Sequence, residues 1–391
     1  MKTRHFLLGA TGLLAMASCS NDELVGYNHD GDEISFNVVT NAGTRAADVY
    51  CNNNMPGAFE VWALTDGKTY ISGDAIEYDG SKWVNKSGTR YWPEGAVTFF
   101  AHKNAGDAFD WNNGAPVINN FTVANDVAQQ NDLIYAVKTT AKPNAAGQVT
   151  LNFRHALSQI VFAAKNTNKN LYVEVSGVSV CKVGETNTFT YGTGDTDDNI
   201  INHDGTIGDI TYGNNWGKWN ALSGGTATFT VDFDAVAVAG DNTAVSLTSD
   251  NDADKEFNAN AMLLLPQNTT AWAVEGDNVE GKPVDQQGTY FLVKCSIWNV
   301  AGDTFNKDTD ICLWGKDGAK EIAIPVAFNW EQGKKYLYTF VFGEGNGGYD
   351  PEEPDPDDPD PDPVLVPITF AVTVDDFVPV NATDVEIPKL N

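Results

Sequence analysis

The chain has 391 residues, of which 24 are Lys or Arg and 53 are Asp or Glu, so its formal net charge at pH 7 is −29. This excess of acid repels nucleic acid and anionic lipid, which argues against a nucleic-acid partner and favours solubility. Its 36 Gly, 20 Phe, 13 Tyr and 10 Trp are typical of a protein rich in β-strands and turns, and its length favours two domains.

Residues 1–19 have the pattern of a lipoprotein signal peptide. Lys2 and Arg4 precede an apolar run, and small residues then lead to Cys19. Such a segment is removed from the mature protein, and Cys19 is the predicted lipidation site. A plain secretory signal cut near Ala17 is the alternative, and it would leave Cys19 as a free thiol. No later apolar stretch approaches the roughly 20 residues that cross a bilayer, so we expect the protein to contact the membrane only through the lipid.

Residues 20–45 are interpreted as a propeptide that contains the first β-strand. Ile34, Phe36 and Val38 recur at every second position, which indicates a strand with one buried face. A stretch of small residues follows and contains a single basic residue, Arg45. Flexible stretches of this kind are where proteases cut. An ordinary turn with a solvated arginine is the alternative, and the residues alone leave both interpretations open.

Short strand-like runs alternate with turn signals over most of the remaining chain, and a sustained helical period is almost absent. This pattern predicts an all-β fold of the sandwich type. The Ala-, Asn- and Gly-rich stretch at 141–148 is the best candidate for a domain boundary. We therefore expect an N-terminal β-sandwich domain at 46–146 and a C-terminal β-sandwich domain at 147–345.

The C-terminal part of the chain contains a detached strand. Residues 346–363 form a linker that is first rich in Gly and then in Pro and Asp, and its run of alternating acid and proline at 350–363 supports neither a helix nor a sheet ladder. In the segment 364–391, every even position from 364 to 374 is apolar, as expected for a strand with one buried face. A lone strand is not stable by itself, so it must lie in a groove of its own domain or of another molecule. The residues predicted to be buried are Val364, Val366, Ile368, Phe370, Val372 and Val374.

The two terminal strands resemble each other. ISFNVVT, residues 34–40, aligns with ITFAVTV, residues 368–374, and this pairs Ile34 with Ile368, Phe36 with Phe370 and Val38 with Val372. Two strands with the same buried face can fill the same groove. We predict that the N-terminal strand fills the groove first and is removed, and that the C-terminal strand of another copy then replaces it.

Motifs along nearly the whole chain resemble those of the fimbrillin-like type V pilins of the Bacteroidia. They are the acidic residues just after Cys19, ISFNV followed by TRAA, YWPEGAVTFFAH at 91–102, LNFRHALSQIVFAAKN at 151–166, LLLPQ at 263–267, W-x-x-G-x-x-Y-x-Y at 330–338 and ITFAVTVDDF at 368–377.

The resemblance implies two transthyretin-like β-sandwich domains with a detached C-terminal donor strand. It also implies export as a lipoprotein to the outer membrane surface and cleavage between Arg45 and Ala46 by a surface arginine-specific protease. The cleaved chain would polymerise with copies of itself or related pilins by C-terminal strand exchange. The donor strand would begin near Val364.

No residue pattern indicates catalysis, a metal or a cofactor. The sequence lacks H-E-x-x-H, G-x-S-x-G and the P-loop. The run 343–348 formally fits a dinucleotide fingerprint, but it leads into the linker and not into a helix, so we interpret it as a hinge. His155 is interpreted as a structural residue. The Asp-rich segments 195–198 and 250–254 lack the glycine and glutamate of a calcium loop and are interpreted as solvated turns.

Cys295 and Cys312 lie on consecutive predicted strands. A cross-strand disulfide and two free thiols are both compatible with this placement.

These observations favour a non-enzymatic structural subunit of a surface fimbrium that supports adhesion or biofilm. The main alternative is a monomeric surface lipoprotein that binds glycans, with tryptophans as stacking platforms and the C-terminal strand folded back on its own sheet. A secreted hydrolase is the third hypothesis.

Overall fold

The computed structural model describes residues 33–40, 57–112, 114–142, 148–192, 217–248, 261–272, 288–302, 304–351, 363–364 and 366–376. Cys19, Arg45 and Ala46, the predicted lipidation and cleavage sites, lie outside these residues, as do the two Asp-rich segments. Within the described ranges, no helix has the length and apolar character to span a membrane.

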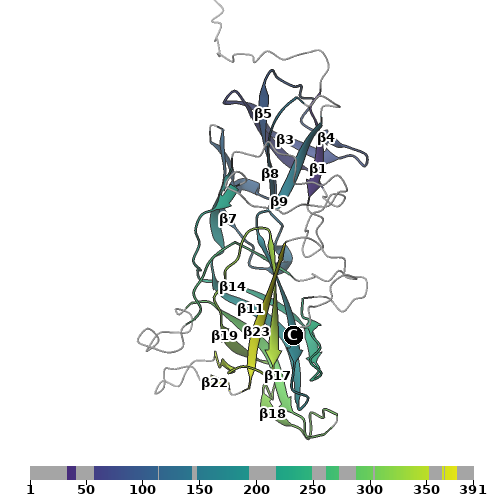
Figure 1. Cartoon of the computed structure of the whole chain (residues 1–391), viewed down its shortest axis with the longest axis vertical. Coiled ribbons are helices and arrows are strands. Elements are labelled where there is room, and N and C mark those ends of the chain that lie inside the picture. The colour runs from purple at the N-terminus through teal and green to yellow at the C-terminus, as the bar shows by residue number, and fades with distance from the viewer. Residues whose placement is uncertain are drawn as a thin grey trace, which may run out of the picture.

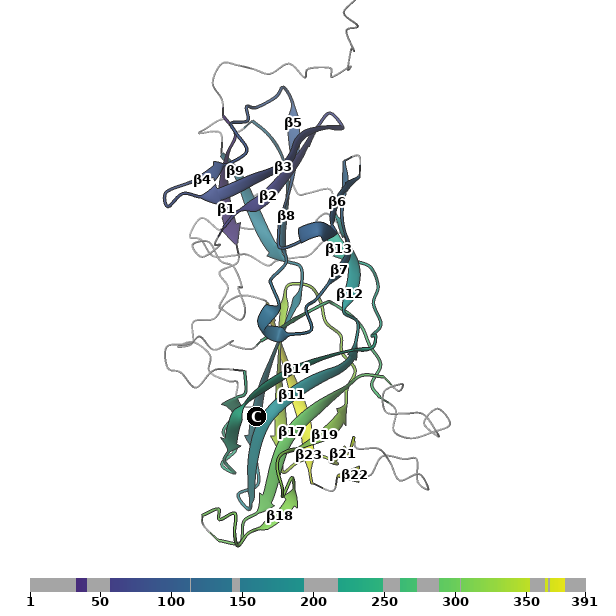
Figure 2. The same ribbon diagram turned by 180° about the vertical axis from the view of Figure 1, so that it is seen from behind.

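The described chain consists almost entirely of β-strands, which confirms the all-β fold class. The molecule is elongated, with a barrel at one end, a small sheet near the middle and a two-sheet sandwich at the other end (Figures 1 and 2). Within the described residues, the helical elements are two short 3-10 turns, η1 (Gly106–Ala108) and η2 (Val127–Gln129).

Seven strands close the barrel in the order β1-β4-β3-β2-β5-β8-β9. Its apolar interior includes Phe59, Phe99 and Phe153, all of which are buried. The strands are β1 (Ser35–Thr40), β2 (Phe59–Thr65), β3 (Lys68–Tyr78), β4 (Trp83–Asn85), β5 (Ala96–Lys103), β8 (Ile134–Ala141) and β9 (Gln148–His155).

The β2–β3 hairpin shows how local sequence fixes the barrel. Its two turn residues, Asp66 and Gly67, have positive φ of 49° and 73°. An Asp-Gly pair tolerates this backbone, whose twist matches that of the flanking strands. Residues alternate between the interior and the surface along β2, so the turn and the burial pattern specify the same register.

The barrel extends past the domain boundaries expected from the sequence. It includes β9, which was expected in the domain at 147–345, and β1, which was expected in the propeptide. The physical reason is strand pairing, because β9 lies between β8 and β1 and supplies the edge that each of them needs.

Two sheets form the sandwich. One has the order β14-β11-β17-β19-β21-β22, with β18 also paired to β17, and the other has the order β15-β10-β20-β23, with β16 also paired to β10. The strands of the first sheet are β11 (Leu171–Val183), β14 (Ala227–Val238), β17 (Tyr290–Asn299), β18 (Ile311–Trp314), β19 (Lys320–Pro325), β21 (Gly348–Tyr349) and β22 (Pro363–Val364). Those of the second sheet are β10 (Ser158–Asn166), β15 (Val245–Ser246), β16 (Met262–Leu264), β20 (Lys334–Phe342) and β23 (Ile368–Asp376).

Aromatic side chains join the two sheets of the sandwich. Phe291 of β17 is fully buried and packs edge-to-face against Phe162 of β10 and Phe340 of β20, with ring centroids 5.8 and 5.3 Å apart. Such contacts add to the large apolar area that each ring buries. Phe291 therefore lies at the centre of the sandwich core.

A small sheet near the middle draws strands from both halves of the chain, in the order β13-β12-β7-β6. The strands are β6 (Phe109–Asn112), β7 (Ala115–Thr122), β12 (Thr186–Tyr191) and β13 (Gly217–Trp219). At the end of β9, His155 Nδ1 lies 2.7 Å from Asp132 Oδ2, and both side chains are buried. His155 thus has a structural partner at the junction between barrel and sandwich.

We expect Phe291→Ala to lower the free energy of unfolding by about 3–5 kcal/mol, because it removes a buried ring and leaves a cavity between the sheets. Ile311→Ala is the control, since Ile311 is 65% exposed on β18 and such surface changes are usually within about 0.5 kcal/mol. Chemical unfolding of both variants tests this, and equal losses would contradict the assigned core.

Candidate functional site

The first half of the candidate site is the groove in which β1 lies. β1 runs parallel to β9, from Ser35 opposite Gln148 to Thr40 opposite Phe153. Its other edge pairs with β4 only where Phe36 lies opposite Trp83. β1 is therefore the strand that closes the barrel, and without it the edges of β4 and β9 would be unpaired.

The apolar face of β1 is buried in this groove. Ile34, Phe36 and Val38 are 3%, 3% and 5% exposed. The ring of Phe36 packs edge-to-face on Phe99 of β5, with centroids 5.8 Å apart. Fully burying a side chain of this size contributes roughly 1.5–3 kcal/mol, so these three residues hold β1 firmly in place.

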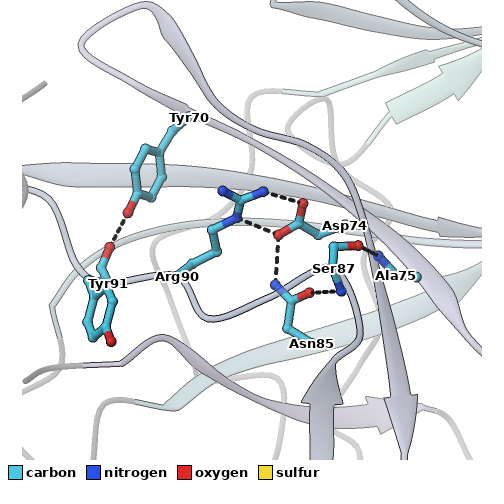
Figure 3. Close-up of polar contacts among 7 residues, drawn as sticks. All are labelled: Tyr70, Asp74, Ala75, Asn85, Ser87, Arg90 and Tyr91. Carbon is cyan, nitrogen blue, oxygen red and sulfur yellow. Dashed lines mark hydrogen bonds and ion pairs between the residues drawn. The ribbon is translucent and has the colours of Figure 1, made fainter. Parts of the chain in front are cut away.

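The segment between β4 and β5 clasps the start of β1 through its main chain. The Ile34 amide donates a hydrogen bond to the Arg90 carbonyl at 2.7 Å, and Glu33 forms a β-bridge with Tyr91. The Tyr91 carbonyl also accepts a hydrogen bond from the hydroxyl of Tyr70 on β3 (Figure 3). This clasp has no counterpart among the residues predicted from the sequence.

A polar network on β3 and β4 holds the clasp in position (Figure 3). Arg90 donates from Nε and Nη2 to the two carboxylate oxygens of Asp74, at 2.7 and 2.8 Å. Asn85 Nδ2 donates to the same carboxylate at 2.7 Å, and Asn85 Oδ1 accepts from the Ser87 amide at 2.8 Å. These bonds join β3, β4 and the following segment to one another, and the main chain of that segment contacts the start of β1 at Arg90 and Tyr91.

The network sets the charge state of Asp74. Burial alone would raise its pKa, but the hydrogen bonds from Arg90 and Asn85 and the positive charge of Arg90 outweigh this effect and lower the pKa below the ordinary value of 3.8. Asp74 is therefore ionised at neutral pH, as a bidentate partner of arginine should be.

The second half of the candidate site is the C-terminal strand. β23 runs antiparallel to β20, from Ile368 opposite Phe342 to Asp376 opposite Lys334. In the isolated chain it therefore lies on its own sandwich. β10 occupies the other side of β20, and among the described residues no strand pairs with the outer edge of β23.

In the isolated chain, the apolar face of β23 is only partly covered. Ile368 is 1% exposed, and Phe370 is half-buried with its ring 5.9 Å from that of Phe291. Val372 and Val374 are 48% and 51% exposed. Phe291 of the facing sheet contacts Phe370. The side chains farther along β23 remain about half exposed.

The cysteines do not form the disulfide considered from the sequence. Cys295 lies opposite Val175 and Lys320, whereas Cys312 lies opposite Trp298, farther along β17. Both are free thiols, as is Cys181, whose pKa burial raises to about 12. A search of the described residues finds no metal-binding group of three or more His, Cys, Asp or Glu side chains.

The chain is similar to a known protein family and to several solved structures. A family model described as fimbrillin-like matches residues 44–352. Among solved structures, a fimbrial protein from Bacteroides vulgatus has a TM-score of 0.50 at 13% identity, with 87% of this chain and 98% of that chain covered. A candidate cell adhesion protein from Parabacteroides distasonis has a TM-score of 0.45 at 12% identity, with 88% and 98% covered. No curated protein matches the sequence.

We expect Asp74→Asn to lower the free energy of unfolding at pH 7 by about 1–3 kcal/mol, because it removes the buried negative charge and replaces one of the two acceptor oxygens by an NH2 group. It should also speed hydrogen exchange of the β1 amides, since the Arg90 segment clasps that strand. Glu77→Gln is the control. Glu77 pairs with Lys86 at 3.4 Å on the surface, where such pairs contribute at most about 1 kcal/mol.

The effect of Asp74 should also depend on pH. A lowered folded-state pKa contributes stability that is fully present above the unfolded value of 3.8 and is lost as the pH falls through the folded value. The unfolding free energies of wild type and Asp74→Asn should therefore converge in acid. A difference that stays constant from neutral pH to well below the lowered pKa would show that the carboxylate charge is not what holds the clasp.

Proposed function

Since the chain belongs to the fimbrillin-like family, we propose that it is a non-enzymatic structural subunit of a surface fimbrium that supports adhesion or biofilm. In this proposal it is exported as a lipoprotein on Cys19, is cut between Arg45 and Ala46 by a surface arginine-specific protease, and polymerises by strand exchange. The partners are copies of itself or related pilins. The membrane is contacted only through the lipid, before cleavage.

The observation that carries the proposal is the unequal burial of the two matching strands. β1 has all three of its aligned apolar residues buried, whereas β23 leaves Val372 and Val374 about half exposed. In the alignment of the two strands, Val372 corresponds to the buried Val38. Placing β23 of one copy in a vacated β1 groove would remove this apolar surface from water, which contributes roughly 25 cal/mol per Å².

Strand exchange of this kind requires that β1 first be released. While β1 is covalently attached, its high effective concentration excludes a competing strand. Arg45 follows β1 by five residues, so a cut at this point separates the strand from the rest of the chain.

Release of β1 also supplies the driving force for a replacement. The vacated groove would present the unpaired edge of β9 and the apolar interior around Phe99 and Phe153. Unpaired strand edges and exposed apolar patches promote association with another chain. A strand with the apolar spacing of Ile34, Phe36 and Val38 satisfies both requirements.

A second candidate function is a monomeric glycan-binding lipoprotein. Two observations favour it: β23 is seated on its own domain, and a hollow of about 510 Å³ beside β13 is lined by Trp219, Asn268 and Glu331 among others. A tryptophan beside amide and carboxylate groups suits a sugar. Unheated gel electrophoresis of surface material separates the two functions, because the fimbrial subunit gives a ladder and the monomer a single band.

We expect Arg45→Ala to abolish the ladder while the chain stays folded, lipidated and monomeric, because β1 remains in its groove. Thr44→Ala, one residue away, is the control and should assemble normally. The readouts are the ladder and the N-terminal residue of the surface protein, which should be Ala46 only where cleavage occurs. Equal ladders from Arg45→Ala and wild type would refute cleavage as the trigger.

The same substitution should destabilise the monomer when it is made in β1 and the polymer when it is made in β23. Val38→Thr buries a hydroxyl in the barrel and should destabilise the uncut monomer by about 1–3 kcal/mol. Val372→Thr should leave the monomer nearly unchanged, because this position is already half exposed, but should lower the temperature at which polymer dissociates. Polymer of Val372→Thr that melts with wild type would contradict insertion of this strand into a buried groove.

A further inference from the structure

The C-terminal segment is held in two different places. β22 pairs with β21 in the first sheet of the sandwich, with Val364 opposite Gly348 and Pro363 opposite Tyr349. From Ile368 onward, β23 pairs with β20 in the second sheet. Between β22 and β23 the chain crosses from one sheet to the other, so a single rigid strand from 364 to 374, as the sequence predicted, is not what the structure contains.

The first part, residues 363–364 and 366–367, is held by the glycine run 343–348, and we call these residues the anchor. The Gly343 amide donates a hydrogen bond to the Pro367 carbonyl at 2.9 Å. A Cβ on Gly347, where φ is +88°, would lie 2.2 Å from the Val364 carbonyl oxygen. This approach is open only to glycine. The run is therefore a tightly fitted seat, which corrects its interpretation as a hinge.

Burial stays high from the anchor to the first residue of β23, Ile368, which is 1% exposed, and it falls toward the far end of β23. Val364 and Val366 are 5% and 6% exposed and belong to the main core of the sandwich. Val372 and Val374 on β23 are about half exposed, and β23 has a backbone partner on one edge only among the described residues. Detaching the anchor would expose buried apolar side chains to solvent. Detaching the far part of β23 would expose little additional apolar surface, because its side chains are already about half exposed.

Position 367 marks the change between the two parts. Pro367 is exposed, lies directly before β23 and has no amide hydrogen to donate to a ladder. Gly345 lies below the start of β23, where an added Cβ would be 2.8 Å from the Ile368 carbonyl oxygen. The chain is thus tightly packed up to Pro367, and regular pairing with β20 begins just after it.

We propose that the anchor stays in its own domain during assembly and that only β23, from Ile368 onward, moves into the neighbouring copy. This inference rests on the proposed strand exchange. It removes Val364 and Val366 from the predicted donor residues and keeps Ile368, Phe370, Val372 and Val374. The transferred part then begins at Ile368, which is also the first residue of the sequence alignment between the two terminal strands, where it pairs with Ile34.

Two pairs of cysteines test this in the full chain cut after Arg45. The anchor lock is Tyr349→Cys with Pro363→Cys, and the strand lock is Leu337→Cys with Thr373→Cys, each an opposed antiparallel pair. Opposed residues of antiparallel strands are about 4.5–5.5 Å apart at Cα, which suits a disulfide. Mass spectrometry confirms each bond, and unheated gels are compared with and without reductant.

The oxidised anchor lock should give the same ladder as its reduced form, and the oxidised strand lock should lose the ladder until it is reduced. Loss of the ladder with both locks would overturn the anchor while leaving strand exchange intact. An unchanged ladder with both locks would instead overturn strand exchange itself, so the two failures are distinguishable.

A second variant tests the anchor without a disulfide. Val366→Thr should lower the unfolding temperature of the monomer, because Val366 is a core residue of its own domain, and should leave the dissociation temperature of the polymer unchanged. Val372→Thr should show the reverse. A shift of the polymer dissociation temperature by Val366→Thr as large as that by Val372→Thr would place Val366 in the acceptor groove and overturn the anchor.

Discussion

The barrel is closed by the pairing of β1 with the edges of β4 and β9. β9 is paired on one side with β8 at its end, and its other side is satisfied along β1. Because β1 is also the strand that brings Ile34, Phe36 and Val38 into the barrel, one short segment supplies both the hydrogen bonds and the apolar filling that close it. A domain closed by a terminal strand can be opened by a single cut between that strand and the body.

Side chains of β3, β4 and the following segment stabilise the wall of the groove next to β1. The Asp74 carboxylate accepts hydrogen bonds from Asn85 and from the Arg90 guanidinium, and these bonds join β3, β4 and the following segment. Strand exchange would therefore meet a groove with a preformed polar frame. Preorganisation of this kind reduces the ordering that a new partner must bring about.

The sequence predicted the features that depend on local pattern. Alternation at 34–38 matched the burial of β1, and the alternation of short strand-like runs with turn signals matched the all-β fold, because side-chain period and turn chemistry are local properties. It did not predict that β9 belongs to the barrel, since pairing with β1 joins residues more than a hundred positions apart. Nor does the alternation at 364–374 say how far the chain's own sandwich covers Val372 and Val374, because the coverage of a strand depends on where the facing sheet ends. The Asp74–Arg90 clasp had no sequence signal beyond a lone acid and a lone base.

The most direct measurement is a disulfide between two copies at the predicted place. Thr150 of β9 lies opposite Asn37 of β1, and Asn37 aligns with Ala371 in the matching strand. Chains with Thr150→Cys and chains with Ala371→Cys are cut after Arg45, mixed, allowed to assemble and oxidised. We expect an intermolecular disulfide between these two positions, mapped by mass spectrometry. A polymer ladder that forms without this bond would contradict replacement of β1 by the C-terminal strand of another copy.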